Sequence, residues 1–116
     1  MDALDGALAP RRGEVVLAVA SGDYGKPRPA LVIQSDLFNE THASVTVCPI
    51  TSTLVEAPLF RIALRPSRAN GLQKPSQVMA DKVQTLKRER VRERIGVITR
   101  EQMLSVDGAL RLWLRV

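Results

Sequence analysis

The side chains that most often carry acid–base or metal chemistry are scarce in this sequence. His42 is the only histidine, and histidine is the side chain that normally changes charge near neutral pH. Its polar neighbours, Asn39, Glu40 and Thr41, favour a surface loop over a catalytic position. Cys48 is the only cysteine, so the chain can form no internal disulfide, and a zinc site of three or four Cys and His ligands is not expected. The sequence therefore predicts neither a metal nor a cofactor.

Basic side chains, in contrast, are abundant. Seventeen lysines and arginines outnumber twelve acidic residues, and the net charge of +5 favours a polyanionic partner. A basic surface that only keeps the protein in solution is the alternative. The densest run, 87–94 (KRERVRER), contains two glutamates, so we interpret it as a solvated face rather than an RNA-binding patch. Aromatic residues make up only 3% of the chain, so few of them can stack on bases.

Short apolar, β-branched runs separated by turn-forming residues indicate a mostly β domain. Strands are expected at 13–20, 29–34, 44–50, 59–64 and 95–98, with one or two more within 77–86. The intervening segments are expected to be a mobile loop at 21–27, loops at 36–42 and 65–75, and a short helical turn within 87–94. Residues 1–11 show no periodicity and are interpreted as a loose arm on a single domain, 1–116.

One helix is expected at the end of the chain. Thr99 and Gln102 have the spacing of a capping box. Met103, Val106, Leu110 and Trp113 then recur at helical spacing on one face. This face carries more large side chains than a domain of this size obviously needs, so part of it is expected at a dimer interface. Several strands followed by one helix argue for a compact, mainly antiparallel barrel with a packed helix.

The chain gives no sign of a membrane or a secreted location. No segment approaches the roughly 20 apolar residues of a membrane span. The first ten residues, MDALDGALAP, contain two aspartates where a signal peptide would have positive charge. We therefore expect a cytoplasmic protein.

Three blocks of the sequence resemble the MazF/PemK family of toxins. They are 12–34 (RGEVVLAVASGDYGKPRPALVIQ), 47–52 (VCPITS) and 76–85 (SQVMADKVQT), and they occur in the family's order. With the terminal helix, the match covers nearly the whole chain after residue 11. The resemblance implies an SH3-like, CcdB-type barrel of about five to seven mainly antiparallel strands with a C-terminal helix, usually as a homodimer. It also implies the toxin of a type II toxin–antitoxin system, inhibited by an antitoxin with an acidic, disordered tail.

The activity implied by the resemblance is metal-independent, sequence-selective cleavage of single-stranded RNA. The 2′-hydroxyl attacks the adjacent phosphate and leaves a 2′,3′-cyclic phosphate and a 5′-hydroxyl, so DNA is excluded. Arg28 matches the family's catalytic arginine, and its fork of donors suits a phosphate. A role as the acid is less attractive, because a guanidinium holds its proton tightly. Thr51 matches the second catalytic position and can donate to a phosphoryl oxygen.

The third candidate, Asp81, is the position at which the PemK branch places an acidic base. That branch has an arginine two residues earlier, whereas this chain has Met79, so a structural carboxylate is an equal alternative. Structural alternatives also remain for the other two candidates. Arg28 could be a surface residue that caps a strand, and Thr51 could be a turn residue. The substrate-binding positions expected beside these three are Tyr24, Lys26, Ser52 and Lys82.

Two other functions remain open at this point. A DNA gyrase poison of the CcdB kind has the same fold without a nuclease site. Such chains end in a Trp-Gly-Ile type of sequence, whereas this one ends Trp113-Leu114-Arg115-Val116. A non-catalytic nucleic-acid-binding module is supported by the charge alone.

Overall fold

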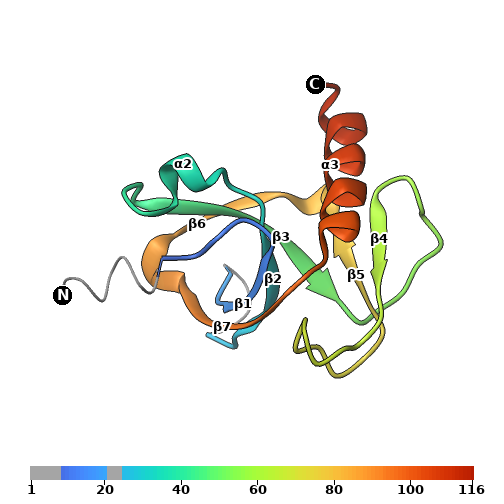
Figure 1. The fold of residues 1–116 in the computed structure, drawn as a ribbon, viewed down its shortest axis with the longest axis horizontal. Coiled ribbons are helices and arrows are strands. Elements are labelled where there is room, and N and C mark those ends of the chain that lie inside the picture. The colour runs from blue at the N-terminus through green and yellow to red at the C-terminus, as the bar shows by residue number, and fades with distance from the viewer. Residues whose placement is uncertain (1–8, 21–24) are drawn as a thin grey trace.

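A computed structural model describes residues 9–20 and 25–116 and shows a curled antiparallel sheet with one long helix (Figure 1). The seven strands confirm the predicted mostly β architecture. The predicted loose arm falls mainly on residues outside this range, and at its end the Arg11 backbone N–H donates to Glu14. The elements in chain order are β1 (Glu14–Ala18), β2 (Arg28–Val32), α2 (Asp36–Asn39), β3 (Ser44–Thr51), β4 (Arg61–Leu64), β5 (Ser76–Met79), η1 (Ala80–Lys82), β6 (Gln84–Lys87), η2 (Arg88–Arg90), β7 (Val91–Val97) and α3 (Arg100–Leu114).

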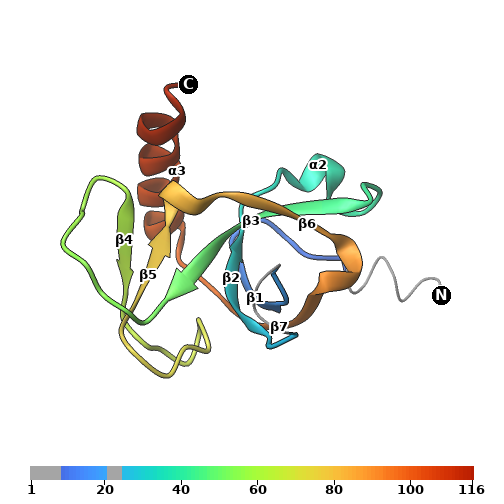
Figure 2. The same cartoon turned by 180° about the vertical axis from the view of Figure 1, so that it is seen from behind.

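The longest strand, β3, is shared by two parts of the sheet. One edge pairs with β2, which continues to β1 and β7. The other edge pairs first with β6 and then with β5, beyond which lies β4. The two views show β3 running from the β1–β2–β7 side of the molecule to the β4–β5–α3 side (Figures 1 and 2). The beginning of β3 therefore pairs with β6, and its end at Ile50 and Thr51 pairs with β5.

The strands at the centre are buried on both faces. Val15 and Leu31 belong to a cluster that α3 covers, whereas their neighbours Val16 and Val32 belong to a second cluster on the other face. All four have exposures of 2% or less. Alternating side chains point to opposite faces of a strand, so the near-continuous apolar runs of β1 and β2 follow from this double burial.

A three-residue insertion separates β5 from β6. The strand β3 advances three positions from Val47 to Ile50, whereas the opposite segment advances six from Val78 to Gln84. The extra residues form the 3₁₀ turn η1, which contains Asp81. The expected one or two strands around Asp81 are thus two strands, and the insertion turns Asp81 out of the ladder.

The terminal helix begins with the predicted capping box: Thr99 accepts from the Gln102 backbone N–H, and the Gln102 side chain accepts from the Thr99 N–H. Of the four residues of the predicted apolar face, Val106 and Leu110 are buried against the chain's own sheet, whereas Trp113 is half exposed. Other exposed apolar side chains lie on the helix and just beyond it, at Leu104, Leu112, Leu114 and Val116. In the part of the chain described here, no helix is long and apolar enough to cross a membrane.

Two segments differ from the sequence-based expectation. The expected loop after β2 contains the short helix α2, which Ser35 caps through the Leu37 N–H. The buried Asn39 ends this helix and donates to the Gln34 carbonyl, a tertiary contact that local sequence patterns do not reveal. The last strand is also longer than expected and begins at Val91, because η2 occupies only three residues of the charged segment.

Candidate active site

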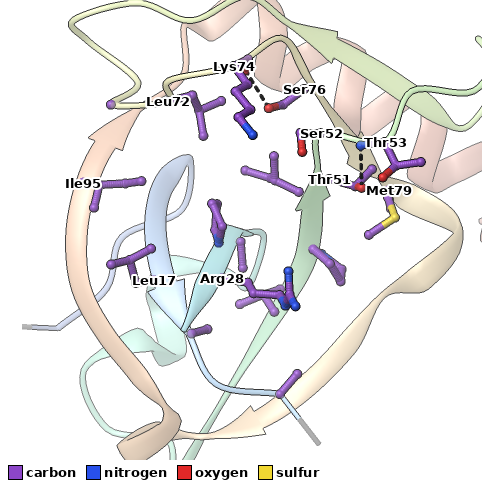
Figure 3. Close-up of a pocket in the computed structure, with 18 of the residues that line it drawn as sticks. Leu17, Arg28, Thr51, Ser52, Thr53, Leu72, Lys74, Ser76, Met79 and Ile95 are labelled. Carbon is purple, nitrogen blue, oxygen red and sulfur yellow. Dashed lines mark hydrogen bonds between the residues drawn. The ribbon is translucent and has the colours of Figure 1, made fainter. Parts of the chain in front are cut away.

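An open groove of about 670 Å³ lies where β1, β2 and β3 meet the 71–74 segment. It is lined by the end of β1 and the beginning of β2, by Thr51 at the end of β3 with Ser52 and Thr53 after it, and by residues of β5 to β7. Figure 3 shows Lys74 and Ser52 on one side of an open space and Arg28 on the other, with the Thr51 hydroxyl bound to the backbone of Thr53 at the end of β3. The groove is large enough to hold part of an extended polymer chain.

The sheet register places Arg28 and Thr51 together. Ala30 pairs with Pro49 in the antiparallel β2–β3 ladder. The ladder ends with this pair, and two positions beyond it Arg28 begins β2 and Thr51 ends β3, so the alternation of side chains along each strand puts both on the face that Ala30 and Pro49 occupy. Both line the groove. The Pro29 ring fixes its own backbone angle next to Arg28, so the guanidinium is attached to a rigid strand start.

The hydroxyl of Thr51 has a defined orientation. Its oxygen accepts a hydrogen bond from the backbone N–H of Thr53 at 3.0 Å. A threonine hydroxyl has one proton to donate and two lone pairs, so the bond from Thr53 leaves the proton for a ligand. Thr51 can therefore donate to a phosphoryl oxygen next to Arg28, with Ser52 beside it on the same wall.

Among the described residues, the charges that line the groove are all positive. Arg28 and Lys74 are its only charged residues in the described part of the chain, and no carboxylate or imidazole is among its lining residues there. This arrangement favours an anionic ligand such as a nucleic-acid backbone. The sequence analysis missed Lys74, which lies in the expected 65–75 loop. Its only sequence signal is a lysine between Gly71 and Pro75, two turn-forming residues.

Asp81 lies outside this set. It accepts two hydrogen bonds from Arg61 of β4, from Nε at 2.9 Å and from an Nη at 3.2 Å. The side chains are only 11% and 13% exposed. The hydrogen bond from Arg61 lowers the pKa of Asp81 below the ordinary value, despite the opposing effect of burial. A carboxylate in this state is a weak base, and its hydrogen bonds with Arg61 connect β4 to the η1 insertion.

The other predicted side chains are spread over the molecule. Lys82 is exposed in η1 and is not among the residues that line the groove, and neither is Lys26, which lies exposed just before β2. Tyr24 lies outside the residues that the structure describes. The structure thus brings Arg28, Thr51 and Ser52 together, and it adds Lys74.

The single histidine lies far from the groove, and the single cysteine is buried. His42 precedes the start of β3, and its Nδ1 accepts from the backbone N–H of Ser44. The eight-residue strand β3 separates it from Thr51, a distance of roughly 20 Å or more at the usual rise per residue. Cys48 is fully buried, and desolvation raises the pKa of its thiol to about 12.

Comparisons with known proteins agree on one family. The family model described as PemK-like, MazF-like toxin of type II toxin-antitoxin system matches residues 11–114. A curated relative in Mycolicibacterium smegmatis, named probable endoribonuclease MazF, is 45% identical over 107 residues that cover 91% of this chain and 97% of that protein. Endoribonuclease MazF of Staphylococcus epidermidis is 30% identical over 104 residues, or 86% of this chain and 87% of that protein.

Solved structures resemble the fold closely. An endoribonuclease from a mycobacterial species, solved in complex with its cognate antitoxin, superimposes with a TM-score of 0.79 at 26% identity. The match covers 93% of this chain and 97% of that chain. The arrangement of strands and terminal helix is therefore one already seen in endoribonucleases of this kind.

Proposed function

Since the chain belongs to the family of PemK-like, MazF-like toxins of type II toxin–antitoxin systems, we propose that its groove binds single-stranded RNA and cuts it without a metal. As a member of this family the chain is an endoribonuclease toxin. A gyrase poison without a nuclease site is not favoured, because the curated relatives are endoribonucleases. The observation that supports the mechanism is that Arg28, at the start of β2, and Thr51, at the end of β3, line the same groove.

The reaction uses a nucleophile that RNA itself carries. The 2′-oxygen attacks the neighbouring phosphorus, its proton leaves to water, and the bond to the 5′-oxygen breaks. The leaving 5′-oxygen takes a proton from water, so the products are a 2′,3′-cyclic phosphate and a 5′-hydroxyl. Arg28 stabilises the charge on the phosphoryl oxygens with its fork of donors, and the Thr51 hydroxyl donates a hydrogen bond to one of them. With no strong base among the described lining residues, the enzyme is expected to be slow.

The test is cleavage of a defined single-stranded RNA in the presence of EDTA, with analysis of the new ends. Cleavage should persist, give 5′-hydroxyl ends and stop when the scissile 2′-hydroxyl is replaced by hydrogen. Arg28→Ala should lower the rate about 10²–10³-fold, the usual loss for one donor to a developing charge. Thr51→Ala should cost less, and His42→Ala, a distant control, should cost almost nothing. Cleavage of the deoxy substrate would exclude this mechanism.

The partners are proposed on the same grounds. An antitoxin with an acidic, disordered tail would fit the groove, because both lining charges are positive, and it would compete with RNA there. The exposed apolar residues Leu104, Leu112 and Trp113 of α3 support a homodimer that uses part of this helix. An RNA substrate is consistent with a cytoplasmic location. Titrating the antitoxin from the neighbouring gene against cleavage tests the competition, and light scattering at micromolar concentration tests the dimer.

A further inference from the structure

The segment that precedes β5 brings a second cation to the groove. Figure 3 shows the Lys74 side chain entering the open space between Leu72 and Ser52, on the opposite side from Arg28. Lys74 is exposed and forms no ion pair with the carboxylates of the described residues. A lysine without a carboxylate partner, directed into a groove of positive charge, can bind an anion that enters from solution.

The backbone that carries Lys74 is rigid on its N-terminal side. Asn70 is 2% exposed, and its side-chain oxygen accepts from the backbone N–H groups of Ser67 and Leu72 at 3.0 and 2.9 Å. Its amide nitrogen donates to the Arg65 carbonyl at 2.8 Å. Leu72 is itself buried in the core. The buried Asn70 side chain thus stabilises, through these hydrogen bonds, the segment that leads into Lys74.

Two glycines complete this anchorage. Gly71 has φ +70°, and a Cβ built there would lie 2.1 Å from the carbonyl oxygen of Ile95. A Cβ on Gly96 would lie 2.3 Å from the carbonyl carbon of Asn70. The 70–71 backbone therefore rests directly on β7, where only glycine fits. On the other side of Lys74, the buried Ser76 hydroxyl donates to the Lys74 carbonyl at 2.8 Å.

We propose that Lys74 binds a phosphate of the RNA next to the scissile one, and thereby fixes the position of the strand in the groove. The proposal rests on the proposed function, because it assumes that RNA occupies this groove. Arg28 and Thr51 hold the phosphate that reacts, and Lys74 holds a neighbour from the opposite wall. An ammonium acts as a point charge and a guanidinium as a planar fork, which suits anchoring and transition-state binding respectively. Lys74 is therefore a substrate-binding residue, whose loss affects affinity more than the chemical step.

The first test measures binding without cleavage. The probe is a short, unstructured, fluorescein-labelled RNA in which only the scissile 2′-hydroxyl is replaced by hydrogen, and the readout is fluorescence anisotropy over a range of salt. Lys74→Ala should weaken binding about 5–10-fold and reduce the slope of log affinity against log salt by about 0.7, the value for one lost contact with a single strand. Lys74→Arg should keep both the affinity and the salt dependence of the wild type. Arg68→Ala is the matched control, because it removes one positive charge from an exposed position of the same loop outside the groove.

The second test locates the contact. Neutral methylphosphonates replace the phosphates on either side of the mapped cleavage site, one at a time. In the wild type, one of these substitutions should weaken binding as much as Lys74→Ala does, and in the Lys74→Ala variant the same substitution should cost nothing further. With unmodified RNA, the cleavage rate of Lys74→Ala at saturating substrate should differ less than about 3-fold from that of the wild type, while its KM rises.

The outcomes separate this proposal from the function on which it rests. If wild-type protein cuts RNA but Lys74→Ala binds like Arg68→Ala, the Lys74 contact is refuted and the nuclease stands. If Lys74→Ala lowers the saturated rate about 10²-fold with affinity unchanged, Lys74 acts on the scissile phosphate and the proposal is wrong. If wild-type protein binds the RNA with the expected salt slope but never cuts it, the nuclease mechanism fails while the Lys74 contact survives.

Discussion

Replacing Asp81 by asparagine separates a structural role from a catalytic one. The substitution keeps the shape of the side chain but removes the charge that accepts both hydrogen bonds of Arg61. Hydrogen bonds to charged groups each contribute about 1.5–3 kcal/mol, and breaking a buried ion pair by removing one partner costs about 3–5 kcal/mol. The pair is slightly exposed and asparagine still accepts one bond, so we expect the free energy of unfolding to fall by about 2–3 kcal/mol.

That loss should be visible as a lower melting temperature. At roughly 4 °C per kcal/mol for a domain of this size, Asp81→Asn should melt about 8–12 °C below the wild type. Its single-turnover cleavage rate at 25 °C and saturating RNA should stay within about 2-fold of the wild type, because Asp81 does not line the groove. A general base in the reaction would instead cost about 10²–10⁴-fold.

The control is Glu93→Gln, which makes the same chemical change at an exposed position of β7 and should alter neither quantity. The double variant Asp81→Asn with Arg61→Gln should be more stable than the sum of the two single losses predicts, because the second change removes an interaction that is already broken. A variant that melts like the wild type but cuts about 10³-fold more slowly would refute our interpretation and restore Asp81 as a catalytic candidate.

Three further predictions concern stability. Gly108→Ala should raise the free energy of unfolding by about 0.5–1 kcal/mol in chemical denaturation, because a Cβ there meets only open space in the middle of α3. Gly71→Ala should lower the melting temperature by at least several degrees, and a wild-type melting curve would contradict the packing against Ile95. The pKa values of Asp36 and Asp81 are lowered, chiefly by the Arg12 backbone N–H and by Arg61. These two carboxylates should therefore contribute fully to the free energy of unfolding above about pH 5. Their contribution should be lost as the pH falls from the unfolded pKa of 3.8 toward the lower pKa values of the folded state. In Asp81→Asn, stability should fall less steeply over this acidic range.

The parts of the fold that follow from local patterns could be predicted from the sequence. The capping box of Thr99 and Gln102 needs only a spacing of three residues, and the strands of the sheet need only apolar runs between turns. The helix α2 was not predicted, because its four residues show almost no periodicity. It is stabilised instead by a contact of the buried Asn39, which local sequence patterns do not reveal. Likewise, the burial of Val106 and Leu110 depends on which elements lie beneath the helix.

The candidate site shows the same division. The resemblance to a family suggested Arg28 and Thr51 as single positions, but their presence in one groove depends on the pairing of β2 with β3, which no local pattern determines. Lys74 was missed because its place in the groove depends on contacts between Asn70 and Gly96, residues far apart in the sequence. The role of Asp81 remains a prediction to be tested by the variant described above.

The central position of β3 has a consequence for when the protein becomes active during its synthesis. The groove needs the 71–74 segment, which lies on β7, and it needs β5 and β6, which complete the second edge of β3. A nascent chain that has released only the first 70 residues from the ribosome has Arg28 and Thr51 but lacks the opposite wall. The groove is therefore complete only once the segments after residue 70 have been synthesised.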